Sequence, residues 1–95
     1  MDTKKLEALA TAVQTGSFTR AAEVLGYTQS GLTHMMNSLE KDIGFPLLVR
    51  SRTGIRLSAA GQRVFPMIQD LLRADETLER EIRLSNTRRE ETIRV

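Results

Sequence analysis

The chain has 95 residues, of which 40% are hydrophobic, and a formal net charge of +2. This length allows one small domain with a modest core, and the lack of cysteine excludes disulfides and thiolate metal sites. A single histidine leaves no histidine cluster for a metal, and no apolar run approaches the length of a membrane span. We therefore expect a cytoplasmic protein without a membrane segment or a metal.

The first predicted helix starts from a cap at Asp2 or Thr3 and ends at Gln14 or Thr15, with Gly16 after it. Its apolar positions recur at helical spacing, so this helix should pack against the rest of the domain. The positions expected to face inward are Leu6, Leu9, Ala10 and Val13.

Residues 17–44 predict two short helices joined by a tight turn. Thr19 can cap the first, and Gly26 supplies the left-handed residue that ends it. Its apolar positions, which we expect to face inward and to leave Arg20 and Glu23 outside, are Ala21, Ala22, Val24 and Leu25. Thr28 then caps the second helix, which ends at Gly44. Its apolar residues recur every three or four positions and are Leu32, Met35, Met36, Leu39 and Ile43. Two helices joined by a short turn that contains Gly have the layout of a DNA-reading helix-turn-helix.

The second helix of this pair, residues 28–43, carries a polar face opposite its apolar stripe. The residues of this face are Gln29, Ser30, Thr33, His34, Asn37 and Lys41. Between Glu23 and Glu40 there is no formal charge, although 27% of the chain is charged. Amide, hydroxyl and imidazole groups exchange hydrogen bonds with base edges in the major groove. The pattern favours DNA reading, and the alternative is a small three-helix domain whose polar face meets only water.

Two short apolar runs, residues 47–50 and 55–57, flank a turn that contains Gly54 and predict a β-hairpin, which we call the wing. From residue 43 to residue 69 there is no Asp or Glu, whereas four arginines give a formal charge of +4. They are Arg50, Arg52, Arg56 and Arg63. Such a local field suggests a polyanionic partner, with Arg52 in a minor groove and Arg50 and Arg56 at phosphates. The alternative is a solvated hairpin with arginines for solubility.

Beyond the wing, Ser58 caps a long predicted helix with an apolar stripe, and Pro66 inside it should bend or loosen the helix. The stripe consists of Val64, Ile68, Leu71, Leu78 and Ile82 and is interrupted by Asp75. A helix that extends past the core of so short a chain needs an apolar surface, and a second copy of itself is the simplest one. We expect a homodimer. The alternative is a helix that folds back onto its own domain.

The C-terminal part of the chain is strongly polar. Residues 70–91 mix acids with arginines and predict an ion-paired, solvated helix surface, and residues 86–91 are polar enough for a linker. Residues 92–95 alternate like the opening of a strand, so we expect the chain to be part of a longer protein. The predicted organisation is a DNA-binding domain at 1–58, a linker and dimerisation helix at 59–88, and the start of a hinge at 89–95.

The sequence resembles the N-terminal DNA-binding domain and linker helix of LysR-type transcriptional regulators. The residues that carry the resemblance are Gly16, Ser17, Phe18, Ala21, Ala22, Leu25, Gln29, Ser30, Leu39, Glu40, Gly44, Pro46, Leu47, Leu48, Arg50, Leu57, Ser58, Ala60 and Gly61. The resemblance implies a mainly α fold, a winged helix-turn-helix of three helices and a β-hairpin, followed by a long linker helix. It also implies a C-terminal domain, absent here, that binds a small-molecule effector, so we expect no cofactor in this stretch.

The resemblance further implies that the protein regulates transcription by binding an inverted-repeat operator in double-stranded DNA as a dimer. Gln29, Ser30, Thr33 and His34 would meet base edges, with Asn37 a further candidate on the same face. The DNA backbone and the minor groove would be met by Thr28, Lys41, Arg50, Arg52 and Arg56. Linker helices of the family pair antiparallel, here through the stripe from Val64 to Ile82, and full-length members often form tetramers. Such a protein would be cytoplasmic and associated with the bacterial nucleoid.

The chain departs from the family at two positions of the polar face. The family usually has Pro where Ser30 stands and very often Arg where His34 stands. Because an Arg can hold guanine O6 and N7 with two bonds whereas a neutral His makes one, His34 changes the expected base preference.

Three other functions compete with this one. A nonspecific architectural DNA binder would carry more positive charge. A winged-helix protein-interaction module would use Met35 and Met36 as an adaptable surface, although such methionines more often fill a core. Enzyme activity is the weakest alternative, because the acids after residue 69 lie on an exposed helix without a nucleophile or a metal partner.

Overall fold

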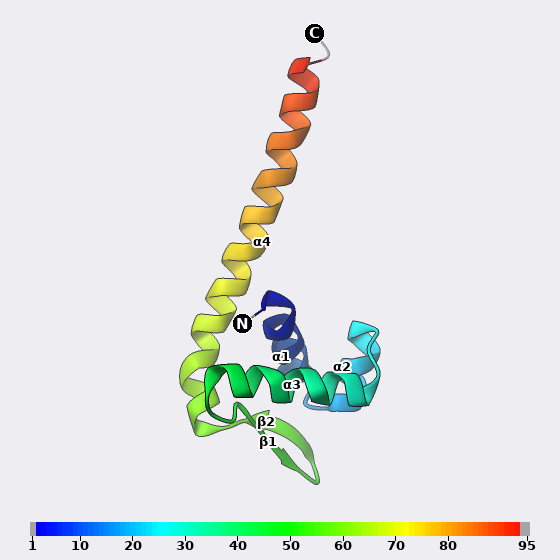
Figure 1. Cartoon of the computed structure of the whole chain (residues 1–95), viewed down its shortest axis with the longest axis vertical. Coiled ribbons are helices and arrows are strands. Elements are labelled where there is room, and N and C mark those ends of the chain that lie inside the picture. The colour runs from blue at the N-terminus through cyan, green and yellow to red at the C-terminus, as the bar shows by residue number, and fades with distance from the viewer. Residues whose placement is uncertain (1, 94–95) are drawn as a thin grey trace.

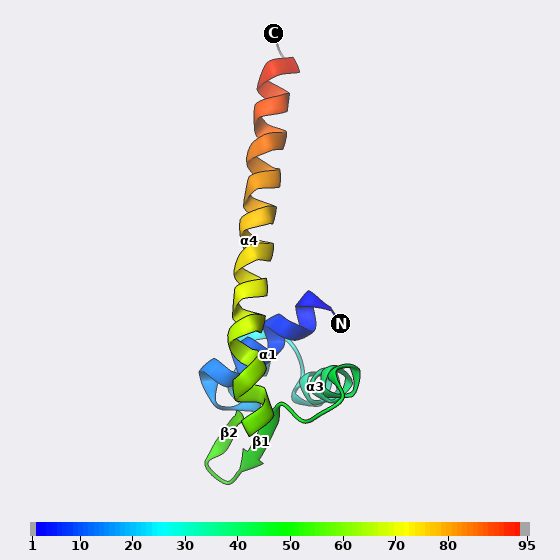
Figure 2. The same ribbon diagram turned by 90° about the vertical axis from the view of Figure 1, so that its left-hand side faces the viewer.

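The computed structural model describes residues 2–93. The elements are α1 (Thr3–Thr15), α2 (Phe18–Leu25), α3 (Gln29–Ile43), β1 (Leu48–Ser51), β2 (Gly54–Leu57) and α4 (Ala59–Ile93). The three short helices and the two-stranded hairpin form a head, residues 2–58, from which α4 extends away (Figures 1 and 2). The winged helix-turn-helix followed by a long helix is thus confirmed.

The core lies where α1, α2 and α3 meet, and it also includes residues from the segment before β1 and from α4. Its largest fully buried side chains are Leu6, Leu9, Leu32, Met36, Leu39 and Leu47. The stripe predicted for α3 is confirmed, with Met35 and Ile43 partly buried beside it. In α1 the predicted face is partly wrong, because Ala8 and Ala12 are fully buried whereas Ala10 and Val13 are only partly buried.

The start of α2 differs from the sequence prediction. The N-cap is Ser17, not Thr19, since the Ser17 hydroxyl accepts a hydrogen bond from the Arg20 N–H at 3.3 Å. Phe18 therefore becomes the first helical residue, and its ring enters the core. Val24, which we expected to face inward, is 66% exposed, because a two-turn helix offers only one face to α1 and α3.

Helix α3 and the wing form where the sequence predicted them. The Thr28 hydroxyl accepts the Gly31 N–H at 3.0 Å, and Gly44 ends α3 with a positive φ of 100°. Strands β1 and β2 pair antiparallel from Leu48 opposite Leu57 to Ser51 opposite Gly54. The register puts the turn of the wing at residues 52–53.

The wing is fastened to the corner between α1 and α2. The Ile55 N–H donates to the Gly16 carbonyl at 3.0 Å. Beside this bond Gly54 adopts a φ of +131°, and a β-carbon there would stand 2.3 Å from the Gly16 oxygen. Only glycine fits so close an approach with that backbone conformation. The wing is therefore part of the head and not a free arm.

Helix α4 continues unbroken past Pro66 to Ile93 and points away from the head, so it does not fold back onto it (Figures 1 and 2). The predicted linker at 86–91 and strand opening at 92–93 are wrong, since these residues are helical. Beyond Pro66 there is no glycine or proline, and Arg and Glu are good helix formers. Residues 94–95 of that predicted strand lie outside the described residues. No helix within residues 2–93 is both long enough and apolar enough to cross a membrane.

Candidate nucleic-acid interface

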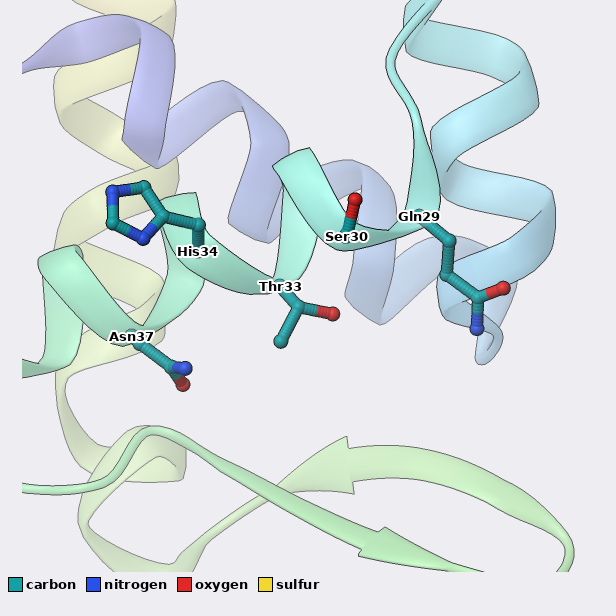
Figure 3. Close-up of a pocket in the computed structure, with 5 residues that line it drawn as sticks. All are labelled: Gln29, Ser30, Thr33, His34 and Asn37. Carbon is teal, nitrogen blue, oxygen red and sulfur yellow. The ribbon is translucent and has the colours of Figure 1, made fainter.

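The polar face of α3 forms one open, shallow hollow on the surface of the head. Five of its six predicted residues line this hollow: Gln29, Ser30, Thr33, His34 and Asn37. Figure 3 shows Gln29, Thr33 and Asn37 pointing toward the side on which the wing lies, whereas Ser30 and His34 project along a neighbouring row. The first row follows from the spacing of four residues, which repeats one side of a helix. The structure thus brings together the residues predicted to contact bases.

These side chains are available to a ligand. Those of Gln29, Thr33, His34 and Asn37 make no hydrogen bond to any residue that the structure describes. Ser30 makes only a 3.4 Å contact, with the Thr28 hydroxyl. Exposed amide, hydroxyl and imidazole groups without internal partners are free to pair with base edges, which display both donors and acceptors.

Two residues predicted to contact the DNA backbone flank this hollow, one at each end of α3. The Thr28 hydroxyl is already engaged as the cap of α3, which leaves it less free than predicted. Lys41 is exposed in the last turn and lines a second hollow with His34, Asn37 and Ser38. A cation beside the neutral face is suited to a phosphate next to the bases being read.

The three arginines of the wing point in different directions. Arg52 lies in the exposed turn between β1 and β2. Arg50 is paired with Ile55 and Arg56 with Val49, so Arg50 and Arg56 lie on opposite faces of the hairpin. The Arg50 guanidinium carbon stands 4.5 Å from the centre of the Phe18 ring. Stacking on this ring holds Arg50 against the head, whereas Arg56 faces away from it.

The carboxylates of this part of the chain are both occupied. Between residues 24 and 69 the only acids are Glu40 and Asp42. Asp42 forms an ion pair with Lys5 at 3.3 Å, and Lys5 also donates to the Ser38 hydroxyl at 2.8 Å. Glu40 Oε2 accepts the N–H groups of Leu47 and Leu48. Sequence reasoning assigned no contact to either acid, although Glu40 is among the residues that carry the family resemblance. Their positions in the sequence do indicate that they need partners, because acids in the last turn of a helix oppose its dipole.

The stripe predicted for dimerisation divides into two parts. Ile68 is buried in the head and Val64 is partly buried against it, whereas Leu71, Leu78 and Ile82 are about half exposed. Near the head, α4 and the end of α3 enclose an apolar groove lined by Ile43, Val64, Met67, Ile68 and Leu71. The residues that the structure describes thus leave Leu71, Leu78 and Ile82 of the stripe only about half covered.

Two acids of α4 pair with arginines on the same helix. Asp70 pairs with Arg73 at 2.9 Å and Glu76 with Arg80 at 3.3 Å, as predicted for an ion-paired helix surface. In the part of the chain that the structure describes, no three His, Asp or Glu side chains gather where they could hold a metal ion.

Comparison with known proteins places this chain in one family. Residues 3–62 match the family model of the bacterial regulatory helix-turn-helix proteins of the lysR family. The chain is 34% identical over 84 residues to the probable HTH-type transcriptional regulator LrrA of Synechococcus elongatus, and 35% identical over 82 residues to the HTH-type transcriptional regulator HdfR of Escherichia coli. These matches cover 88% and 86% of this chain. The chain spans only 29% of either relative.

The fold agrees with a solved structure of the family. The CbnR_DBD–DNA complex superimposes with a TM-score of 0.81 at 29% identity, covering 90% of this chain and 98% of that one. The family model covers most of the chain, and the head and long helix of this chain match a domain solved on DNA. The resemblance noted in the sequence is therefore confirmed. The chain belongs to the lysR family of bacterial regulatory helix-turn-helix proteins.

Proposed function

We propose that this chain is the DNA-binding part of a sequence-specific transcriptional regulator. The observation that carries the proposal is the face of α3, where polar side chains without internal partners lie beside an arginine-bearing wing. A neutral face suits base edges, and arginines suit phosphates and a narrow minor groove. The relatives LrrA and HdfR are named as transcriptional regulators, and CbnR_DBD has been solved with DNA, which supports the same role here.

In this proposal α3 lies in the major groove and the wing lies at the minor groove. Gln29 and Asn37 carry amides, which pair with both N6 and N7 of adenine, and the Thr33 methyl group can contact the methyl group of thymine. His34 can accept or donate a single bond, so it discriminates less between purines than an arginine would. Arg52 enters the minor groove, and Lys41, Arg50 and Arg56 hold phosphates.

We also propose that two copies bind together. Leu71, Leu78 and Ile82 are exposed on α4, and antiparallel pairing of two such helices would cover them. A dimer with two-fold symmetry places one α3 on each half of an inverted repeat, with half-sites about one helical turn apart or a multiple of it.

The test is selection of bound duplexes from a random pool at about 150 mM salt, where nonspecific binding is weak. An enriched inverted repeat supports the proposal. Retention that depends on salt but enriches no motif would favour the architectural alternative and overturn sequence-specific binding.

Variants of α3 then connect the motif to the polar face. Gln29→Ala or Thr33→Ala should cost about 1–3 kcal/mol on the selected duplex and little on random DNA, because only the selected duplex offers the matching base edge. Gln69→Ala is the matched control, since this exposed glutamine lies on α4, outside the α3 face. Equal losses on both duplexes would contradict a base-reading role for these residues.

A further inference from the structure

Glu40 links the helix that reads bases to the wing. It lies in the last turns of α3, and a single carboxylate oxygen accepts the N–H groups of both Leu47 and Leu48. Leu48 is the first residue of β1, and the Leu47 side chain is fully buried. Hydrogen bonds to an ionised acceptor are stronger than neutral ones, and here two share one oxygen. The start of the wing is thus fixed to α3 by one side chain.

Two physical effects oppose an acid at this position. The C-terminal end of a helix carries partial negative charge, which repels a carboxylate. DNA phosphates beside α3 would repel it as well. Asp42, in the same turn, is compensated by the cation Lys5, whereas the partners of Glu40 are two backbone N–H groups. Both effects disfavour an acid at position 40. The hydrogen bonds of Glu40 account for its presence there if they maintain the geometry of the head.

The segment that Glu40 holds is also tied on its other side. The Leu47 carbonyl accepts the Ser58 N–H at 2.8 Å, and the Ser58 hydroxyl donates to the Pro46 carbonyl at 2.7 Å. In the first turn of α4, a β-carbon at Gly61 would stand 2.4 Å from the Leu47 oxygen. Because the carbonyls are held by the start of α4 and the N–H groups by Glu40, the segment before β1 has little freedom to shift.

We propose that Glu40 is a positioning residue for DNA binding. Without touching DNA, it holds the start of β1 at a fixed distance from α3, so that the face of α3 and Arg52 reach two neighbouring grooves of one duplex together. The inference rests on the proposed function, since it concerns how the α3 face and the wing act on the same DNA.

Two conservative variants separate position from charge. Glu40→Gln keeps the reach of the side chain and an oxygen that can accept both N–H groups, whereas Glu40→Asp keeps the charge and shortens the reach by one methylene. Asp42→Asn is the matched control, because it removes an acid from the same turn without affecting a contact of the wing. All variants are made in the 95-residue chain, and affinity is measured on the selected duplex over a range of salt.

If Glu40 acts by position, Glu40→Asp should weaken binding by about fivefold at ~150 mM salt and lower the salt slope by about one unit, because the displaced wing loses the contact of Arg52 with DNA. We expect the same loss from Arg52→Ala, which removes that contact directly. Glu40→Gln and Asp42→Asn should stay within about twofold of the parent chain. Adding Arg52→Ala to Glu40→Asp should cause little further loss, since both changes remove the same contact. The inference would be overturned if Glu40→Gln weakened binding more than Glu40→Asp. It would also be overturned if the losses of affinity from Glu40→Asp and Arg52→Ala were fully additive in the double variant.

A readout without DNA separates this inference from the proposed function. Amide hydrogen exchange at Leu47 and Leu48 should be faster in Glu40→Asp than in the parent chain, because the shorter side chain no longer brings a carboxylate oxygen to their N–H groups. If the parent chain selects no motif, the proposed function fails. Faster amide exchange in Glu40→Asp would then still show that Glu40 holds the start of β1. If the parent chain binds its motif and Glu40→Asp binds equally well, the positioning role alone fails.

Discussion

The head and the outer half of α4 contain the same apolar residue types in opposite surroundings. In the head, Leu6, Leu32 and Leu39 are at most 1% exposed, whereas on α4 Leu78 is 59% and Ile82 49% exposed. The polar groups differ in the same way. Those of the head tie segments distant in sequence, as Lys5 does with Asp42, but the ion pairs Asp70–Arg73 and Glu76–Arg80 of α4 join residues three or four apart. The head therefore has an apolar core of its own, whereas the outer half of α4 leaves its apolar side chains about half exposed.

The largest expected effect comes from exchanging one leucine in each region. Leu39→Ala should lower the free energy of unfolding by about 2–5 kcal/mol, because it leaves a cavity in a closely packed core. Leu78→Ala should change the unfolding of the dilute, monomeric chain by less than about 0.5 kcal/mol. Urea denaturation at low protein concentration measures both. Similar losses of unfolding free energy from Leu39→Ala and Leu78→Ala would contradict the difference between the head and the outer half of α4.

A second test asks what covers the outer half of α4. With Leu78→Ser and Ile82→Ser combined, the dimer should lose about 1 kcal/mol for each of the four substituted side chains of its two copies, or about 4 kcal/mol together, which raises its dissociation constant by roughly a thousandfold. Sedimentation over a range of concentrations measures this. Thr77→Ser, an exposed neighbour outside the stripe, is the control. A parent chain that stays monomeric at micromolar concentration would contradict the dimer outright.

The contrast between the two regions also explains what the sequence could predict. Helix positions, the wing and the neutral face of α3 all follow from local patterns, namely caps, helical spacing and turn residues. The division of the α4 stripe does not, because spacing alone cannot say where the head ends. Ile68 and Leu78 belong to one stripe, yet the first is buried in the head and the second is exposed.

The errors in the head have a similar cause. Ser17 and Thr19 are both acceptable caps, and the choice depends on whether the core has room for the Phe18 ring. The role of Glu40 depends on two backbone N–H groups that lie seven and eight residues further along the chain. Contacts of this kind arise only when the elements pack together, so a linear pattern cannot reveal them. The polar face of α3 was therefore predictable from the sequence, whereas the contacts that orient it were not.

The smallest effect compares a cation of the head with one of α4. Arg50 stacks on Phe18, a side chain only 8% exposed, whereas Arg80 pairs with Glu76 where both side chains are more than half exposed. A double-mutant cycle with Phe18→Leu and Arg50→Gln should give a coupling of about 0.5–1 kcal/mol that persists at high salt, because the guanidinium is partly shielded from water by the ring. The cycle of Glu76→Gln and Arg80→Gln should give about 0.3–0.5 kcal/mol at low salt and nearly nothing at 1 M salt.

Arg56 supplies the control for the head, since it lies on the face of the wing opposite Arg50. Its cycle with Phe18→Leu should show no coupling, and thermal unfolding of the single and double variants measures all three cycles. Equal salt sensitivity of the Arg50 and Arg80 cycles would mean that the contact between Arg50 and Phe18 is no stronger than a surface ion pair. A persistent Arg50 coupling would instead add this contact to those that fasten the wing to the head, so that its loss would lower both the melting temperature and the affinity for DNA.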